Sequence, residues 1–193
     1  MSRYDFEEFL KSEFRGDPQK VLEKYDYQDS SELFERINNT DVSEVETLKD
    51  IANAIVLWKI ERSISLSDQT IRELKALSAI TDPKDALGKN KEQVASVLTH
   101  LLESKGFRLA MATTFLHFFN PDVFPILDRR AYRVIFKTDY KDSTSIPKRL
   151  GFYFDYLERC IAFHKKVLMG KVSFSEVDKF LYQLDIEIGN ELK

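Results

Sequence analysis

The spacing of apolar and polar residues along the chain is that of a helical protein. Segments with an apolar residue every three or four positions recur from end to end, which is the period of one face of an α-helix. Leu48, Ile51, Ile55 and Trp58 illustrate the pattern. Only 6 glycines and 5 prolines are available to form the turns of a many-stranded sheet. The pattern predicts nine or ten helices, no strand, and an all-α fold.

Two pairs of residues have the spacing of a helix-capping box, Ser43 with Glu46 and Ser173 with Glu176. In this motif the two side chains satisfy backbone N–H groups that the first helical turn leaves unpaired. We expect a helix to begin at each pair. The second of these helices should bury Phe180 and the leucines that follow it.

The segment from 107 to 119, FRLAMATTFLHFF, is apolar on nearly every side. A helix of this kind belongs in the centre of a fold. Residues 123–127 should be extended, because Pro125 disfavours a helical conformation in the residue before it. A short helix is expected over 129–136. Asp128 is therefore expected to lie between a buried, extended segment and the start of a helix.

Composition indicates a folded protein and limits its chemistry. The hydrophobic fraction is 43% and the aromatic fraction 12%, which a disordered chain does not reach. The formal net charge of -3 argues against an evenly basic nucleic-acid binder but permits a local basic face. Cys160 is the single cysteine, so one chain cannot build a zinc or iron–sulfur cluster from thiolates. We expect no metal and no organic cofactor.

The chain shows no sign of membrane insertion. Acidic residues occupy the N-terminal segment where a signal peptide needs an apolar core. No uncharged apolar run approaches the roughly 20 residues of a membrane-spanning helix. The expectation is a soluble cytoplasmic protein without a membrane partner.

The segment SKGFR, residues 104–108, is a candidate phosphate-binding hairpin. Gly106 permits a tight turn, and the helix that follows begins with unpaired backbone N–H groups. Such a helix start can bind a phosphate. Lys105 and Arg108 add positive charge on either side of the turn.

Residues 94–136 resemble the helix-hairpin-helix DNA glycosylase superfamily, which includes endonuclease III, adenine glycosylase and 8-oxoguanine glycosylase. The family has an LPGVG hairpin, an apolar helix, and an apolar approach to an essential aspartate that opens a helix ending in Arg-Val. Gly106 stands at the first hairpin glycine, FPILD at 124–128 is similar to the approach, and Arg133-Val134 is similar to the Arg-Val pair.

The chain departs from the family pattern at several positions. Arg108 replaces the second hairpin glycine, and Ser104-Lys105 replaces Leu-Pro. Ala110 occupies the position of the lysine that bifunctional members use as a nucleophile. The resemblance therefore implies at most a DNA N-glycosylase without a Schiff-base lysine, and it also permits a binding protein without catalysis.

The resemblance implies roles for particular residues. Asp128 would be the catalytic carboxylate that stabilises positive charge on the sugar. Residues expected to contact the DNA backbone are Lys105, Gly106, Phe107, Arg108, Arg129 and Arg130. His117 and Tyr132 are candidates for a base pocket.

Each of these residues also has an ordinary structural interpretation. Asp128 would serve as the N-cap of the helix after it. Arg129 and Arg130 would pair with acidic residues of the fold, and His117 would be a hydrogen-bonded core residue. Both interpretations stay open on the sequence alone.

The resemblance further implies two packed helical lobes with a cleft between them. Residues 44–137 would form the lobe with the hairpin and Asp128, and residues 1–43 with 138–193 would form the second. The leading hypothesis is a protein that binds double-stranded DNA and excises a base. The alternatives are a non-catalytic DNA-binding protein on the same scaffold and a helical protein–protein interaction module.

Overall fold

The computed structural model describes residues 6–25, 31–39, 45–60 and 66–189. These residues are helical and contain no strand, which confirms the all-α prediction. The expected cap at Ser43 lies outside the described residues. The helices are α1 (Phe6–Phe14), α2 (Gln19–Leu22), α3 (Ser31–Asn38), α4 (Val45–Ile60), α5 (Asp68–Ala76), η1 (Leu77–Ala79), α6 (Pro83–Leu87), α7 (Lys91–Glu103), α8 (Leu109–Phe119), α9 (Arg129–Phe136), α10 (Ile146–Phe163), η2 (His164–Leu168), η3 (Phe174–Glu176) and α11 (Val177–Glu187).

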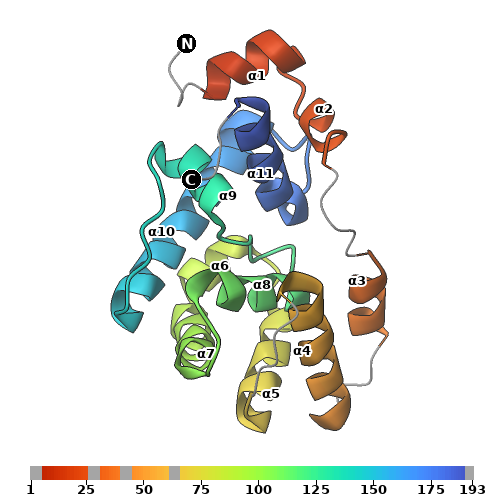
Figure 1. Ribbon diagram of the computed structural model, residues 1–193, viewed down its shortest axis with the longest axis vertical. Helices are drawn as coiled ribbons and strands as arrows, with labels where there is room; N and C mark the ends of the chain where they lie inside the picture. The colour runs from red at the N-terminus through yellow and green to blue at the C-terminus, as the bar shows by residue number, and fades with distance from the viewer. Residues whose placement is uncertain (1–5, 26–30, 40–44, 61–65, 190–193) are drawn as a thin grey trace.

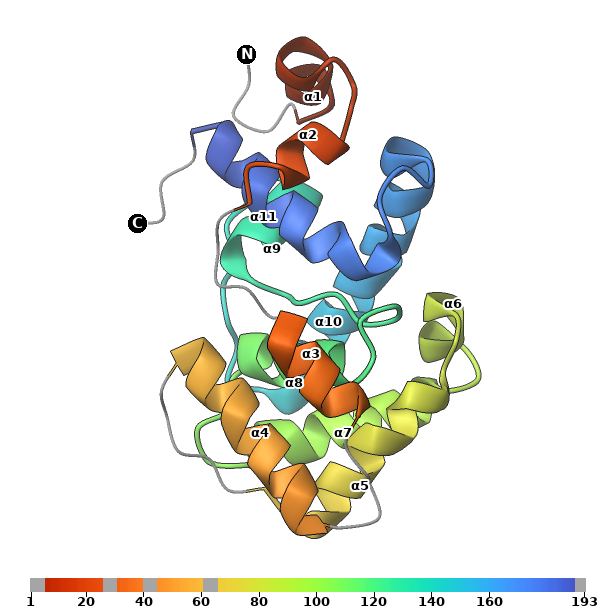
Figure 2. The same cartoon turned by 90° about the vertical axis from the view of Figure 1, so that its right-hand side faces the viewer.

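The helices gather at two ends of an elongated molecule (Figure 1). At one end α11 packs against α9 and α2, and at the other α4, α5, α7 and α8 pack together. Helix α3 lies across α8 beside α4 (Figure 2). Helix α10 contacts α6, α7 and α9, so it joins the two groups. Helix α3 packs against α4 and α8, and α9 packs against α11, so both helices contact elements on the other side of the expected boundaries at residues 44 and 137. The division into two lobes stays a prediction.

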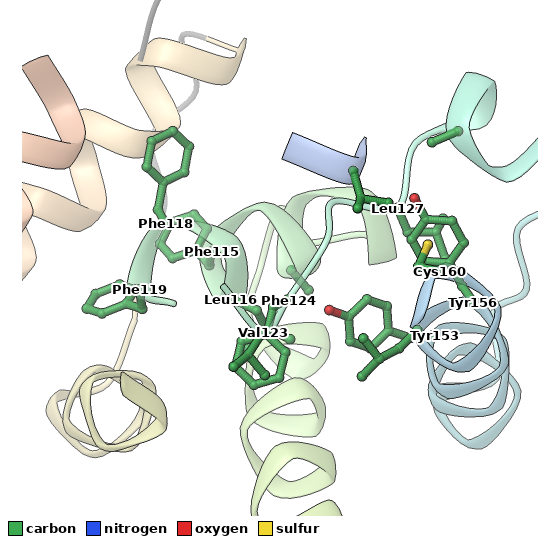
Figure 3. Packing of buried hydrophobic residues seen from close by; sticks show 14 of the residues in the cluster. Phe115, Leu116, Phe118, Phe119, Val123, Phe124, Leu127, Tyr153, Tyr156 and Cys160 are labelled. Atoms are coloured by element: carbon green, nitrogen blue, oxygen red, sulfur yellow. The ribbon is translucent and has the colours of Figure 1, made fainter. Parts of the chain in front are cut away.

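Helix α8 occupies the centre of the fold, as its apolar sequence predicts. Ten of its eleven residues are buried, and Ala110 is the exception. The hydroxyls of Thr113 and Thr114 both donate hydrogen bonds to the carbonyl of Ala110, at 3.0 and 2.8 Å, so the helix carries no unpaired hydroxyl into the core. Phe115, Leu116 and Phe118 project from it into surrounding elements (Figure 3).

The last helix begins differently from the expected capping box. The Ser173 hydroxyl contacts the Glu176 carboxylate at 3.2 Å instead of capping a backbone N–H group. A single 3-10 turn, η3, precedes α11, which begins at Val177. The predicted burial of Phe180 and Leu184 on this helix is confirmed.

Asn120 ties the end of α8 to the end of η1. Its buried amide donates hydrogen bonds to the carbonyls of Leu77 and Ile80, at 2.9 and 2.8 Å. Its own carbonyl accepts a hydrogen bond from the N–H of Phe124 at 3.1 Å. A single side chain thus satisfies two buried carbonyls from a helix end that is 40 residues away in sequence.

The Asn120→Ala variant should be less stable than the wild type by about 3 kcal/mol, because it removes two buried hydrogen bonds and the Ile80 carbonyl loses its donor. Urea denaturation followed by circular dichroism measures the change. Asn53→Ala is the matched control, since Asn53 is exposed on α4, and it should shift the free energy of unfolding by less than about 0.5 kcal/mol. Equal stability of the two variants would contradict this role of Asn120.

Candidate functional site

Asp128 begins helix α9. Its backbone is extended (φ -113°, ψ 175°), and its Oδ1 accepts a hydrogen bond from the N–H of Ala131 at 2.8 Å. The observed helix spans Arg129–Phe136, as predicted. The capping interpretation of Asp128 is therefore correct.

The approach to Asp128 is neither helix nor strand: Val123 belongs to a turn, and residues 124–127 have no regular structure. Its side chains are mostly buried, so its backbone polar groups need partners that are not water. Side chains of three helices supply them. Thr113 of α8 accepts from the N–H of Leu127 at 3.1 Å, and Asp178 of α11 accepts from the N–H of Ile126 at 3.2 Å.

Helix α10 holds the other side of the same segment. The Tyr156 hydroxyl donates to the carbonyl of Ile126 at 2.9 Å, and the Tyr153 hydroxyl reaches the carbonyl of Pro125 at 3.4 Å. Both tyrosines are fully buried and face the segment in Figure 3. The backbone leading to Asp128 is thus fixed from several directions, and the carboxylate is positioned with it.

A pocket of about 290 Å³ opens beside Asp128. Its walls come from α4, α8, α9 and α11 and from the segments that flank them. The lining residues are Tyr25, Trp58, Lys59, Ala110, His117, Phe118, Ile126, Asp128, Arg129, Arg130, Asp178, Lys179 and Tyr182. The pocket thus combines aromatic walls with four cationic side chains and two carboxylates.

The pocket alters the ionisation of Asp128. Burial raises the pKa of its carboxyl group to about 6, because water that would solvate the charge is displaced. The nearby carboxylate of Asp178 acts in the same direction as burial, but more weakly. The capping N–H of Ala131 and the ammonium of Lys59 act in the opposite direction. Asp128 is consequently ionised at neutral pH but takes up a proton in mildly acidic solution.

His117 is buried and forms part of the pocket wall. Its Nδ1 lies 2.8 Å from the carbonyl of Phe124 and 3.8 Å from the carboxylate of Asp178. The short contact fits an Nδ1–H group that donates to the carbonyl, which leaves Nε2 as an acceptor when the ring is neutral. His117 is therefore a hydrogen-bonded core residue that also lines the pocket, and its role toward a base stays a prediction.

Arg130 and Arg133 face a buried carboxylate on α11. Asp185 is fully buried, binds Arg133 through both of its carboxylate oxygens, and accepts from Arg130 Nη1 at 3.0 Å. The hydrogen bonds that Arg133 donates to Asp185 raise the pKa of the Arg133 guanidinium. Arg130 also lies over the Tyr182 ring, 5.5 Å from its centroid. The pairing interpretation holds for Arg130, whereas Arg129 is exposed at the pocket.

The hairpin connects α7 to α8. Gly106 has φ +92°, a conformation that favours glycine, while Lys105 and Arg108 are exposed. Arg108 is the N-cap residue of α8, and its side chain caps no N–H group. Ala110, two residues later, lines the pocket, so the hairpin and the pocket share the first turn of α8.

Two residues proposed for the site lie elsewhere. Phe107 is only 5% exposed and packs against Phe115 with ring centroids 5.1 Å apart, so it is a core residue. Tyr132 stacks on Phe136 with ring centroids 4.2 Å apart, on a part of α9 that does not line the pocket. The first turn of α9 faces the pocket, and Tyr132 points away from it.

Sequence reasoning missed several pocket residues. Asp178, Lys179 and Tyr182 belong to α11, and Trp58 and Lys59 belong to α4. Asp178 stands at a buried position one turn before Phe180 and Leu181, which is a signal of a buried polar residue with a specific partner. The residues on α4 carry no comparable signal.

Among the described residues, no group of three histidine, cysteine, aspartate or glutamate side chains could hold a metal ion. None of the helices described combines the length and the apolar character needed to cross a bilayer.

Comparisons of the chain with protein-family models, with curated proteins and with solved structures found no match. The interpretation of the site therefore depends on its geometry and chemistry.

Asp128→Asn should stabilise the protein at pH 7 by about 1 kcal/mol or more, because it removes a charge that the fold disfavours but keeps a capping oxygen. The raised pKa of Asp128 determines how this gain in stability depends on pH. Above pH 6 the native carboxylate is charged, and its burial lowers the free energy of unfolding in full. Below pH 4 the carboxyl group is neutral and has no such effect. The stability difference between variant and wild type should shrink as the pH falls from 7 to 4.

Chemical denaturation at a series of pH values measures this difference. Asp122→Asn is the matched control, since Asp122 is an exposed carboxylate near the same segment, and its effect should stay below about 0.5 kcal/mol at pH 7. A stability gain from Asp128→Asn that is equal at pH 4 and pH 7 would contradict the raised pKa.

Proposed function

We propose that this protein binds double-stranded DNA and releases a base by hydrolysis of its N-glycosidic bond. The observation that carries the proposal is the pocket at Asp128. A carboxylate that is held by a fixed backbone lines a cavity with aromatic walls and a cationic rim. This combination suits a flat base, a sugar that develops positive charge, and a phosphate backbone.

The aromatic walls suit a base that has left the DNA stack. Trp58, Phe118, Tyr25 and Tyr182 line the pocket, and aromatic rings stabilise an extruded base by stacking. The Phe118 ring packs against Trp58 with centroids 5.1 Å apart, which holds the wall in place. Asp178 and His117 offer acceptor atoms at the same cavity.

Asp128 is the proposed charge-stabilising residue. Cleavage of an N-glycosidic bond builds positive charge on the sugar, and a fixed carboxylate close to that charge lowers the barrier. The same carboxylate orients the attacking water. Burial makes this interaction stronger than it would be in bulk water, and the raised pKa is the accompanying cost.

The cations around the pocket are the proposed contacts to DNA. Lys59, Arg129 and Lys179 line the cavity, and Arg130 lines it while paired with Asp185. Lys105 and Arg108 lie at the start of α8, next to Ala110. Backbone N–H groups of that helix start are suited to a phosphate.

A non-catalytic DNA-binding protein is the second candidate. The observation in its favour is the cap at α9, since the hydrogen bond to Ala131 accounts for an aspartate at position 128 without any chemistry. The protein-interaction module finds less support. The large apolar side chains that are exposed among the described residues are Leu57 on α4, Met169 in the turn after η2 and Ile186 on α11, so they come from separate parts of the chain.

Asp128→Asn should reduce base release at least 100-fold and leave the affinity for duplex DNA within about twofold, because it removes the stabilising charge and keeps the fold. The measurement is a panel of duplexes with different damaged or mismatched bases, with alkali-induced strand cleavage and gel-shift binding recorded in parallel. For the wild type, release should increase as the pH rises through about 6, where Asp128 ionises.

These outcomes separate the two candidates. Binding without release from any duplex in the panel would favour the non-catalytic protein, and release that survives Asp128→Asn would remove Asp128 from the mechanism.

Arg108→Glu should weaken binding to duplex DNA about tenfold and lower the slope of log affinity against log salt by about one, because one phosphate contact is lost. Lys84→Glu makes the same change of charge on α6, away from the hairpin, and should leave the slope unchanged. Fluorescence anisotropy at several salt concentrations measures both. Identical slopes for the two variants would rule out the hairpin contact.

A further inference from the structure

We propose that the protein has a second binding site, for a small carboxylate with an apolar body such as a medium-chain fatty acid. The site is a pocket of about 220 Å³ beside the last turn of α9, at the opposite end of this helix from Asp128. It shares no lining residue with the pocket at Asp128. The inference therefore goes beyond the proposed function and does not depend on it.

The walls of this second pocket are largely apolar. Helix α1, which lies at one end of the molecule in Figure 1, forms one wall, and α9, α10 and η2 form the others. The apolar lining residues are Phe6, Val134, Ile135, Ala162, Phe163 and Val167. Ile135, Phe163 and Val167 pack against the core but are only partly buried. The apolar body of a ligand would complete the burial of these side chains, which the hydrophobic effect favours.

Cationic side chains surround the same pocket. Lys137, Arg159 and Lys166 line it together with the carboxylate of Glu7. Arg159 Nε donates a hydrogen bond to Asp155 at 3.1 Å, whereas neither Lys137 nor Lys166 forms an ion pair within the part of the chain that the structure describes. Three cations and two carboxylates leave one net positive charge. This charge matches a ligand with a single carboxylate, which is ionised at neutral pH.

Two unusual backbone conformations bring the lysines to the pocket. Lys137 has φ +57°, a left-handed conformation in which glycine is favoured at the end of a helix. Lys166 belongs to η2, a π-helical turn in which the N–H of Met169 donates to the carbonyl of His164 at 3.0 Å. Turns of this kind are rare and are found mostly at functional sites. A strained lysine and a π-helical turn at one cavity favour a binding role over a simple gap in packing.

The size and the charge of the pocket limit its occupant. Ligand pockets typically measure about 300–1,000 Å³, so a cavity of about 220 Å³ takes a small molecule. A free phosphate would use the cationic rim but not the apolar walls, and an uncharged hydrocarbon would use the walls but not the rim. A carboxylate with an apolar body uses both parts of the site.

Isothermal titration calorimetry of the full chain with octanoate tests the inference. We expect one molecule to bind with a dissociation constant of about 0.1–1 mM, as the size of the ligand allows. Octan-1-ol lacks the charge and butanoate lacks most of the apolar body, so each should bind roughly tenfold more weakly or worse. Octan-1-ol that binds as tightly as octanoate, or octanoate that does not bind at about 10 mM, would overturn the inference. This comparison needs no variant of the protein.

Variants of the rim test the role of the two lysines. Lys137→Gly removes an ammonium and suits the left-handed backbone, so the variant should fold at least as stably as the wild type. Combined with Lys166→Gln, it should weaken octanoate binding about tenfold, because the charge-assisted contacts to the carboxylate are lost. Lys165→Gln is the matched control, since Lys165 is an exposed lysine on the same turn that does not line the pocket. It should leave the affinity within about twofold.

Ala162→Phe tests the apolar part of the site. Ala162 is exposed on α10 and lines the pocket, so a larger side chain fills the cavity from the solvent side and should weaken octanoate binding about tenfold. In the wild type, octanoate should shift the amide NMR signals of Ile135 and Val167 and leave that of Trp58 unchanged. Affinity that is unchanged in both the rim variant and Ala162→Phe, or shifts that map to the pocket at Asp128, would refute the second site.

Discussion

The structure depends on how the backbone of residues 123–127 is satisfied. This irregular segment is mostly buried and has no neighbouring strand, and each buried N–H or carbonyl without a partner would cost about 1–3 kcal/mol. Hydroxyl, carboxylate and imidazole groups of Thr113, His117, Asp178 and Tyr156 act in place of a sheet. The same bonds bring α8, α10 and α11 to one segment, so the site and the packing of the fold have a common origin.

The central part of this arrangement, helix α8 and the segment that leads to Asp128, could be predicted from the sequence. Continuous apolarity predicted a buried α8, and Pro125 together with the charged residues after it predicted an extended approach and a helix from 129. Asp128 was recognisable because a cap-forming residue stood at the boundary of two clear patterns. Gly106 marked the hairpin for a similar reason, since its left-handed conformation leaves a local signature.

The other pocket residues could not be predicted from local sequence patterns. Asp178 and Lys59 reach Asp128 from helices far from it in sequence, and no spacing rule links them to it. The charges of Arg130 and Arg133 are evident in the sequence. Their partner Asp185 does not differ there from other polar residues of α11, because only the fold shows that it is buried. Ser173 and Glu176 had the spacing of a capping box, yet the chain enters α11 through a 3-10 turn, which changes the direction of both side chains.

Trp58 is the single tryptophan of the chain, and it lies in the pocket wall against Phe118. Indole emission depends on the polarity and on the stacking partners of the ring, so all of the tryptophan emission of the protein comes from a reporter at the candidate site. Any molecule that enters this cavity will alter the emission spectrum without an added dye. The protein therefore has a built-in optical probe with which candidate ligands can be screened.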